Sequence, residues 1–450
     1  MTDKANAREI VLDMLLEVIE GDKYSNIVLS QTLKKYQELD KKDRAFISRL
    51  FTGTLERCLT IDYVINSFSS IAVKKMKPVI RNLLRVSVYQ LMYMDHVPES
   101  AVCNEAVKLT KKRGFLKLSG FVNANLRNIA RNMEQVRYPE KEENKAGYLE
   151  VTYSVPEWLA GELLDQYPLD QVERMLADTF KEKGTSIRCN LTKATPEQLM
   201  AALKEEGVSV EKGRYLEEAF IITGYDYLES LKAFKDGLFT VQDESSMLVC
   251  QAAGIKEEDM VIDVCAAPGG KALHAAEKAK TVSARDLSQY KVKLIEENRE
   301  RMGITNVEIC VWDAAIDNPA DHNRADVVIA DLPCSGLGVL GKKPDIKYKM
   351  TQNQQKELVI LQRNILSTIS EYVKRGGVLI YSTCTVNREE NIENRDWFLE
   401  NFDYEADSLD PYLPVELLDE GTKKGYLQLL QGVHDTDGFF ISRMRRRESL

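Results

Sequence analysis

The stretch Val261-Ile-Asp-Val-Cys-Ala-Ala-Pro-Gly-Gly-Lys271 decides how the second half of the chain folds. A β-branched run ends in an acid, a small-residue loop with two glycines follows, and residues 272–280 have a helical pattern. Such a strand–turn–helix lets backbone N–H groups approach an anionic or polar ligand at the start of the helix. The same turn also occurs for packing alone, so this stretch by itself leaves both explanations open.

The residues around this stretch alternate between strand and helix patterns. Helices are predicted at 245–253, 272–280, 287–302, 352–374 and 389–400, and strands at 261–264, 281–284, 307–311, 325–331 and 377–381. Alternation at this spacing predicts a parallel, doubly wound, Rossmann-like α/β domain over residues 238–450. Its ligand should bind at the carboxyl ends of the strands.

The first half of the chain predicts two further domains. Residues 1–138 read as an all-helical domain, because apolar residues recur at helical spacing from 5 to 133. Residues 139–150 are charged and aperiodic, which predicts a linker. Residues 151–237 predict a small α/β module with strands at 186–191 and 219–222 and a helix at 196–206.

Composition predicts a soluble, cytoplasmic, multidomain protein. The 450 residues are 44% hydrophobic, no apolar run approaches the roughly 20 residues that span a bilayer, and the N-terminus has no secretory apolar segment. Eight scattered cysteines lack a C-x-x-C pair, and four histidines lie far apart. We therefore expect neither a disulfide framework nor a metal site.

Charge is distributed unevenly along the chain. Residues 1–138 hold 23 Lys and Arg against 15 Asp and Glu, and the remainder holds 38 against 55. Two explanations are open. The charges are ordinary solvated surfaces that happen to be uneven, or a basic module binds a polyanion that an acidic enzyme module then modifies. The candidate phosphate contacts are the turn residues Lys111, Lys112 and Arg113 together with Arg127 and Arg131.

Polar residues gather at the predicted strand ends. Asp286 follows the second strand, where an acid commonly hydrogen-bonds a cofactor ribose. Asp313 follows the third strand, and Asp331 ends the fourth. Each could also be an ordinary turn or cap residue. Cys334 and Cys384 follow two of the strands, a position that favours reactive thiols over buried structural ones.

Two thiols beside a ribose-binding acid suit methylation at C5 of cytosine. A thiolate that adds at C6 makes C5 nucleophilic toward a methyl sulfonium donor, and a nearby carboxyl group stabilises the addition. The residues alone do not decide which cysteine attacks.

At these residues the chain resembles the RNA cytosine-C5 methyltransferases that use S-adenosyl-L-methionine, and among them the bacterial 16S ribosomal RNA enzymes of the RsmB (Sun/Fmu) type. The resemblance covers nearly the whole chain. It rests on Asp263–Lys271, Asp331-Leu-Pro-Cys-Ser-Gly336, Thr383-Cys384 and Asp437-Gly-Phe-Phe440, with Ala272 and Leu332 as departures from the usual pattern.

The resemblance implies a role for each matching residue. Cys384 is the nucleophile, Cys334 assists product release, and Asp331 lies between the cofactor and the target cytosine. Asp286 binds the ribose and Asp313 contacts the adenine side. The cofactor loop comprises Cys265, Ala266, Ala267, Pro268, Gly269, Gly270 and Lys271, the last of which also belongs to the catalytic group.

The resemblance also implies the partners. Residues 1–138 look like a NusB-type RNA-binding domain, and the middle module is similar to RNA-recognition folds. The implied substrate is 16S rRNA or an early small-subunit assembly intermediate, methylated by a monomer at the site conventionally numbered 967. A tRNA cytosine-C5 methyltransferase and a non-catalytic, antitermination-type RNA-binding protein are the alternatives. An amino-group methyltransferase fits less well, because its strand-end motif differs and it needs no thiol.

Overall fold

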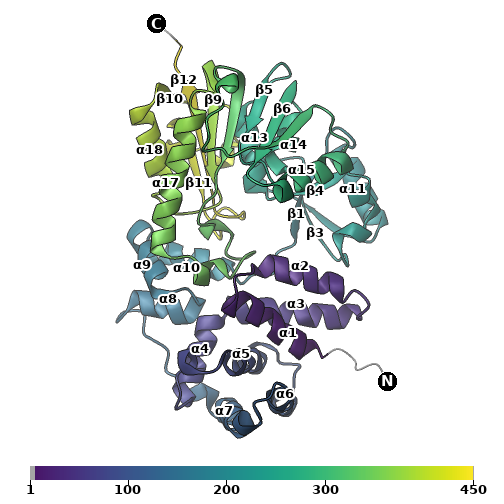
Figure 1. Cartoon of the computed structure of the whole chain (residues 1–450), viewed down its shortest axis with the longest axis vertical. Coiled ribbons are helices and arrows are strands. Elements are labelled where there is room, and N and C mark those ends of the chain that lie inside the picture. The colour runs from purple at the N-terminus through teal and green to yellow at the C-terminus, as the bar shows by residue number, and fades with distance from the viewer. Residues whose placement is uncertain (1–5, 449–450) are drawn as a thin grey trace. The chain divides into compact units, whose positions relative to one another are not determined.

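The computed structural model describes residues 6–448, so expectations that concern residues 1–5 and 449–450 lie outside it (Figure 1). Contacts within the chain define two units. The first comprises Met1–Phe180 and Leu340–Lys349, and the second comprises Lys181–Val339 and Met350–Leu450. No helix among residues 6–448 is both long and apolar enough to cross a membrane.

The first unit is helical, as the apolar spacing predicts. Its core is built from side chains such as Leu12, Leu50, Ile61 and Leu84, which are fully buried. Its helices are α1 (Ala7–Leu15), continued by a π-helical turn (Leu16–Glu20), α2 (Ser25–Lys35), α3 (Lys41–Glu56), α4 (Cys58–Phe68), α5 (Pro78–Tyr93), α6 (Glu99–Lys112), α7 (Ser119–Asn132), α8 (Lys145–Tyr153), α9 (Glu157–Gln166), α10 (Leu169–Asp178) and α16 (Ile346–Lys349).

The predicted linker, residues 139–150, is partly helical. Helix α8 begins at Lys145 because Asn144 caps it, with its side-chain oxygen accepting a hydrogen bond from the Gly147 N–H at 3.0 Å. Leu149 and Val151 are buried against the rest of the unit. The prediction of a linker is therefore wrong for its last residues.

A segment from the second half of the chain also belongs to the helical unit. Asp345 accepts hydrogen bonds from the backbone N–H and hydroxyl of Ser25, and Lys347 Nζ donates to the Glu56 carbonyl at 2.9 Å. Burial lowers the pKa of Lys347 to about 7. This segment follows the Cys334 loop along the chain, and no sequence pattern indicates where it packs.

The second unit begins with a small antiparallel sheet whose strand order is β2-β3-β1-β4. Strand β4 pairs with β1, so this sheet extends past the boundary predicted at residue 237. Its elements are β1 (Thr185–Cys189), α11 (Pro196–Glu205), β2 (Ser209–Lys212), β3 (Ala219–Thr223), α12 (Lys232–Lys235) and β4 (Phe239–Val241).

The larger sheet has the order β10-β12-β9-β8-β5-β6-β7, with β11 paired to β12. Pairs among β5 to β9 are parallel, as predicted, but β10, β11 and β12 add an antiparallel extension. The strands are β5 (Met260–Asp263), β6 (Thr281–Asp286), β7 (Val307–Val311), β8 (Ala325–Asp331), β9 (Val373–Thr383), β10 (Tyr404–Ala406), β11 (Tyr426–Leu429) and β12 (Phe439–Arg446).

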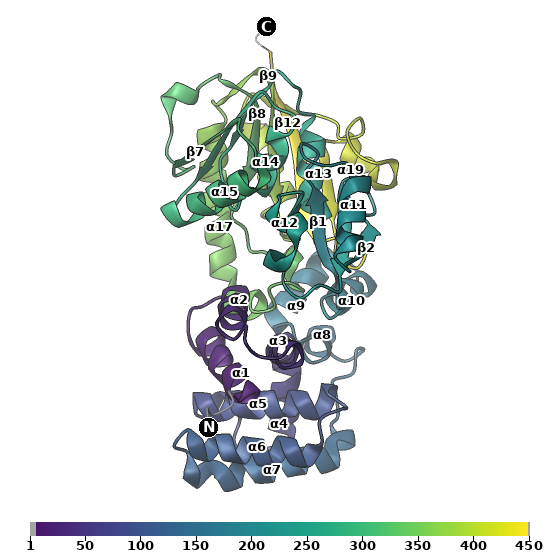
Figure 2. The ribbon, with the colours of Figure 1, turned by 90° about the vertical axis from the view of Figure 1, so that its right-hand side faces the viewer.

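Helices cover both faces of this sheet (Figures 1 and 2). Val261 faces the side of α13, α14 and α15, whereas its neighbour Ile262 faces the side of α17 and α18. The helices are α13 (Glu244–Ala253), α14 (Gly270–Ala276), α15 (Gln289–Met302), α17 (Gln352–Ile369), α18 (Ile392–Asn401) and α19 (Glu420–Lys423). The ligand-binding edge is therefore formed by the loops that follow β5, β6, β7, β8 and β9.

Candidate active site

The two predicted cysteines lie together at the carboxyl edge of the sheet. Strands β8 and β9 are parallel neighbours that end at Asp331 and Thr383, and their loops bring Cys334 Sγ within 3.3 Å of Cys384 Sγ. Neither forms a disulfide bond. The Gly338 N–H donates to the Cys384 carbonyl at 3.0 Å, which ties one loop to the other.

The surroundings of Cys334 disfavour its anion. Its hydrogen bond with Cys384, its burial and the negative charges of Cys384, Glu390 and Asp331 raise its pKa well above the usual value. Cys334 is therefore a neutral thiol at physiological pH, able to donate a hydrogen bond to the neighbouring sulfur.

Lys271 and Asp331 form an ion pair beside the thiols. Lys271 Nζ lies 2.6 Å from Asp331 Oδ2, and Ser382 Oγ donates to Asp331 Oδ1 at 2.9 Å. Burial alone would lower the pKa of Lys271, but Asp331 outweighs it and the pKa is raised. Lys271 thus carries a positive charge in the site, where its Nζ also lies 5.2 Å from the centre of the Phe439 ring.

One buried polar atom at the end of β5, just before the Gly-rich loop, has no hydrogen-bond partner among the described residues. Asp263 is fully buried, and its Oδ2 has no hydrogen-bond partner among the described residues, while Oδ1 accepts from the Cys265 N–H at 3.3 Å. Burial raises the pKa of Asp263 to about 7. Gly269 has φ +108°, and a side chain there would press on Leu273 and Ile295. An orphaned buried carboxyl group indicates a ligand that donates hydrogen bonds.

Asp286 lies next to the same loop. Its carboxylate accepts from the Ala267 N–H at 3.0 Å and from the Leu287 N–H at 2.7 Å, and Lys291 Nζ lies 2.9 Å away. Asp286 therefore supports the loop conformation from the end of β6. These contacts leave carboxylate lone pairs for a hydroxyl donor, because each carboxylate has about four acceptor positions.

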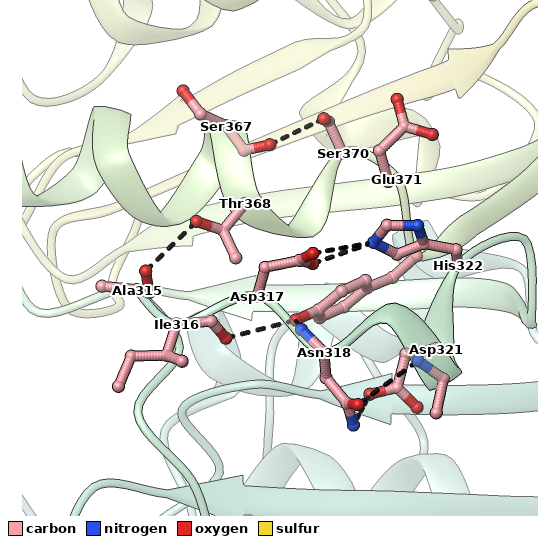
Figure 3. Close-up of polar contacts among 12 residues, drawn as sticks. Ala315, Ile316, Asp317, Asn318, Asp321, His322, Ser367, Thr368, Ser370 and Glu371 are labelled. Atoms are coloured by element: carbon pink, nitrogen blue, oxygen red, sulfur yellow. Dashed lines mark hydrogen bonds and ion pairs between the residues drawn. The ribbon is translucent and has the colours of Figure 1, made fainter.

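Asp313 shapes its own turn after β7. Its carboxylate accepts from the Ala315 N–H at 2.9 Å, and its carbonyl accepts from the Ile316 N–H. The loop beyond it is pinned to the C-terminal end of α17: Thr368 Oγ1 donates to the Ala315 carbonyl at 3.4 Å (Figure 3). In the same loop His322 Nε2 lies 2.9 Å from Asp317 Oδ1. These hydrogen bonds fix the position of Asp313 at the sheet edge without the help of a ligand.

The predicted RNA-binding residues lie in the helical unit and differ in their pairing. Lys112 Nζ lies 2.7 Å from Glu9, and Arg113 lies 2.7 Å from Asp13. These ion pairs compensate much of the charge of the basic turn. Lys111, at the end of α6, and Arg127 and Arg131, one turn apart on α7, are exposed.

Sequence reasoning missed a buried polar network behind the cysteines. Glu390, Ser335, Thr385 and Gln362 are buried and hydrogen-bonded to one another. Glu390 follows Glu389, which is exposed, and no pattern distinguishes the two. Among residues 6–448 no cluster of His, Cys, Asp or Glu is arranged to hold a metal ion.

The Rossmann-like sheet carries a Gly-rich loop, acids at its strand ends and two adjacent thiols along one edge. This combination is typical of the catalytic domain of a methyltransferase. Family models agree. The 16S rRNA methyltransferase RsmB/F model matches residues 251–445, the NusB family model matches 5–131, and the RsmF/B-like ferredoxin-like domain matches 155–226.

Full-length relatives identify the family of methyltransferases to which the chain belongs. The chain is 37% identical to the probable ribosomal RNA small subunit methyltransferase B of Bacillus subtilis, over 99% of both chains. It is 30% identical to the corresponding Synechocystis protein, over 98% of this chain and 99% of that one. The crystal structure of PH0851 matches with a TM-score of 0.82 at 25% identity, over 99% of each chain. The chain belongs to the ribosomal RNA small subunit methyltransferase B family, and the predicted fold class and enzyme class are confirmed.

Proposed function

We propose that this enzyme, acting as a cytoplasmic monomer, transfers a methyl group from S-adenosyl-L-methionine to C5 of one cytosine in 16S rRNA, at the site conventionally numbered 967. The observation that carries the proposal is the pair of thiols 3.3 Å apart beside the Lys271–Asp331 ion pair. The names of the relatives support the substrate, and the thiols support covalent chemistry at a pyrimidine ring.

The residues of the Gly-rich loop fit the cofactor. The methionine part of S-adenosyl-L-methionine carries an ammonium group, which can donate a hydrogen bond to the buried, unpartnered Oδ2 of Asp263. Asp286 is the proposed partner for the ribose hydroxyls, and Asp313 is the proposed contact for the adenine side. When bound, S-adenosyl-L-methionine supplies an electrophilic methyl group.

Four side chains of the protein carry out the other steps of the proposed reaction. The Cys384 thiolate adds to C6 of cytosine, forming the S–C6 bond and moving the C5–C6 π electrons toward C5 and the ring carbonyl. Asp331 contacts the cytosine N3 and amino edge during this addition, and Lys271 fixes the Asp331 carboxylate. After methylation at C5, the C5 proton leaves to water and the S–C6 bond breaks, which returns the electron pair to Cys384. The Cys334 S–H donates a hydrogen bond to the departing sulfur.

The test of the substrate is direct. Purified enzyme is incubated with S-adenosyl-L-methionine and with protein-free 16S rRNA, an early 30S assembly particle or tRNA, and each RNA is mapped by bisulfite sequencing. We expect one protected cytosine in 16S rRNA or in the particle. Protection in tRNA alone would replace the proposed substrate, and protection in none of the three would contradict the proposed reaction.

We propose that exposed basic residues of the helical unit bind RNA phosphates. Arg127→Ala and Arg131→Ala together should weaken RNA binding and lower the slope of log K against log salt by up to roughly 2, because each phosphate contact contributes about 0.9. Filter binding across salt concentrations measures this slope, first for the double arginine variant and then for a triple variant that also carries Lys111→Ala. Lys112→Ala serves as a comparison, since its charge is already paired with Glu9. An unchanged slope in the arginine variants would assign them to ordinary surface.

A further inference from the structure

Glu390 is a charged side chain buried behind the active-site loops. It is fully buried, and its carboxylate accepts hydrogen bonds from the Ser335 N–H at 2.9 Å, from the Ser335 hydroxyl and from Gln362 Nε2 at 2.9 Å. Among the residues that the structure describes, no Lys, Arg or His lies within ion-pair distance of this carboxylate. A buried carboxylate without a cation is costly, so its presence here calls for a reason in the site.

The hydrogen-bond network of Glu390 flanks Cys334 on both sides and reaches one sequence neighbour of Cys384. Ser335 follows Cys334, and Ser335 Oγ also lies 2.7 Å from the hydroxyl of Thr385, which follows Cys384. On the other side of Cys334, Gln362 Nε2 donates to the Pro333 carbonyl at 2.8 Å. One carboxylate therefore organises the backbone on both sides of Cys334 and reaches the residue next to Cys384.

The two thiols consequently face unequal charge. The strongest charge interactions of Cys334 are with Cys384, Glu390 and Asp331, and each of them opposes a negative charge on its sulfur. Lys271, by contrast, interacts electrostatically with Cys384. Burial raises the pKa of Glu390, while its hydrogen bonds from Ser335 and Gln362 lower it. In its ionised form, this carboxylate disfavours an anion on Cys334, whereas the Lys271 cation favours an anion on Cys384.

We propose that Glu390 is a positioning residue that holds Cys334 and Cys384 in register and, through its negative charge, keeps Cys334 neutral so that Cys384 is the sulfur that attacks. This inference rests on the proposed function for the role of Cys384. This role of Glu390 explains why one thiol attacks and the other stays protonated, although both follow neighbouring strands in the same way.

The test measures the thiols of the free enzyme, without RNA. Alkylation by iodoacetamide is followed from pH 7 to about 12, because the Cys334 midpoint lies above the usual thiol range, and mass spectrometry reports Cys334 and Cys384 separately. In Glu390→Gln the midpoint for Cys334 alkylation should fall by about one pH unit or more, the scale of removing a nearby like charge. The exposed neighbour gives the matched control, because Glu389→Gln should leave the midpoint unchanged.

Two further variants separate charge from position and guard against a folding defect. Glu390→Asp keeps the charge and should hold the Cys334 midpoint near that of the wild type. Ser335→Ala keeps the carboxylate but removes a hydroxyl bridge, so the midpoint should stay while methyl transfer slows. If Glu390→Gln leaves the Cys334 midpoint unmoved, or Glu390→Asp shifts it as far as glutamine does, the charge role is wrong. Methyl transfer by the wild type is measured separately, so either failure leaves the proposed reaction standing.

Discussion

The Cys384→Ala enzyme is expected to methylate 16S rRNA at less than about one thousandth of the wild-type rate, the scale seen when a covalent nucleophile is removed. Cys384 interacts electrostatically with Lys271, and in the proposed reaction no S–C6 bond can form without its sulfur. A thousandfold loss corresponds to about 4 kcal/mol of transition-state stabilisation. Transfer of a tritiated methyl group under single-turnover conditions measures it.

The control for this loss is Cys310→Ala, which removes an exposed thiol on β7 and should keep full activity. Binding of S-adenosyl-L-methionine, followed by calorimetry, should be unchanged in Cys384→Ala, since its side chain is not part of the cofactor loop. Near-normal turnover of Cys384→Ala would overturn its assignment as nucleophile.

Much of the catalytic fold could be predicted because its strands are apolar on both faces. Residues 261–262 and 327–330 are short apolar runs that end at Asp263 and Asp331, as buried parallel strands do. Strand β12 escaped prediction because it carries Arg443, Arg445 and Arg446. These charges are tolerated in the sheet because Asp407 and Glu371 pair with them.

The rule that parallel strands end at one edge also placed the site residues. It brought Cys334, Cys384 and Asp331 together from positions far apart in sequence. The rule gives no information on buried residues that lie behind the loops, such as Glu390. Its burial depends on contacts with Ser335 and Gln362, which come from other segments and leave no local pattern.

The Cys334→Ala enzyme is expected to retain methyl transfer to the first cytosine but to accumulate a covalent protein–RNA adduct, approaching one per active enzyme. Without the Cys334 S–H, the sulfur leaving C6 lacks the hydrogen bond that stabilises its developing negative charge. The adduct should survive denaturation and appear as a shifted band on a denaturing gel. Steady-state turnover should fall, whereas the first turnover should be much less affected.

Two comparisons decide whether the trapped bond runs through Cys384 and whether Cys334 acts as a donor. The double variant Cys334→Ala/Cys384→Ala should form no adduct, because it lacks the attacking sulfur. Cys334→Ser keeps an O–H donor at the same position, so its adduct should decay faster than that of the alanine variant. Release of product by Cys334→Ala at the wild-type rate, with no shifted band, would remove Cys334 from the release step. The 3.3 Å sulfur–sulfur contact would then reflect the packing of two strand ends alone.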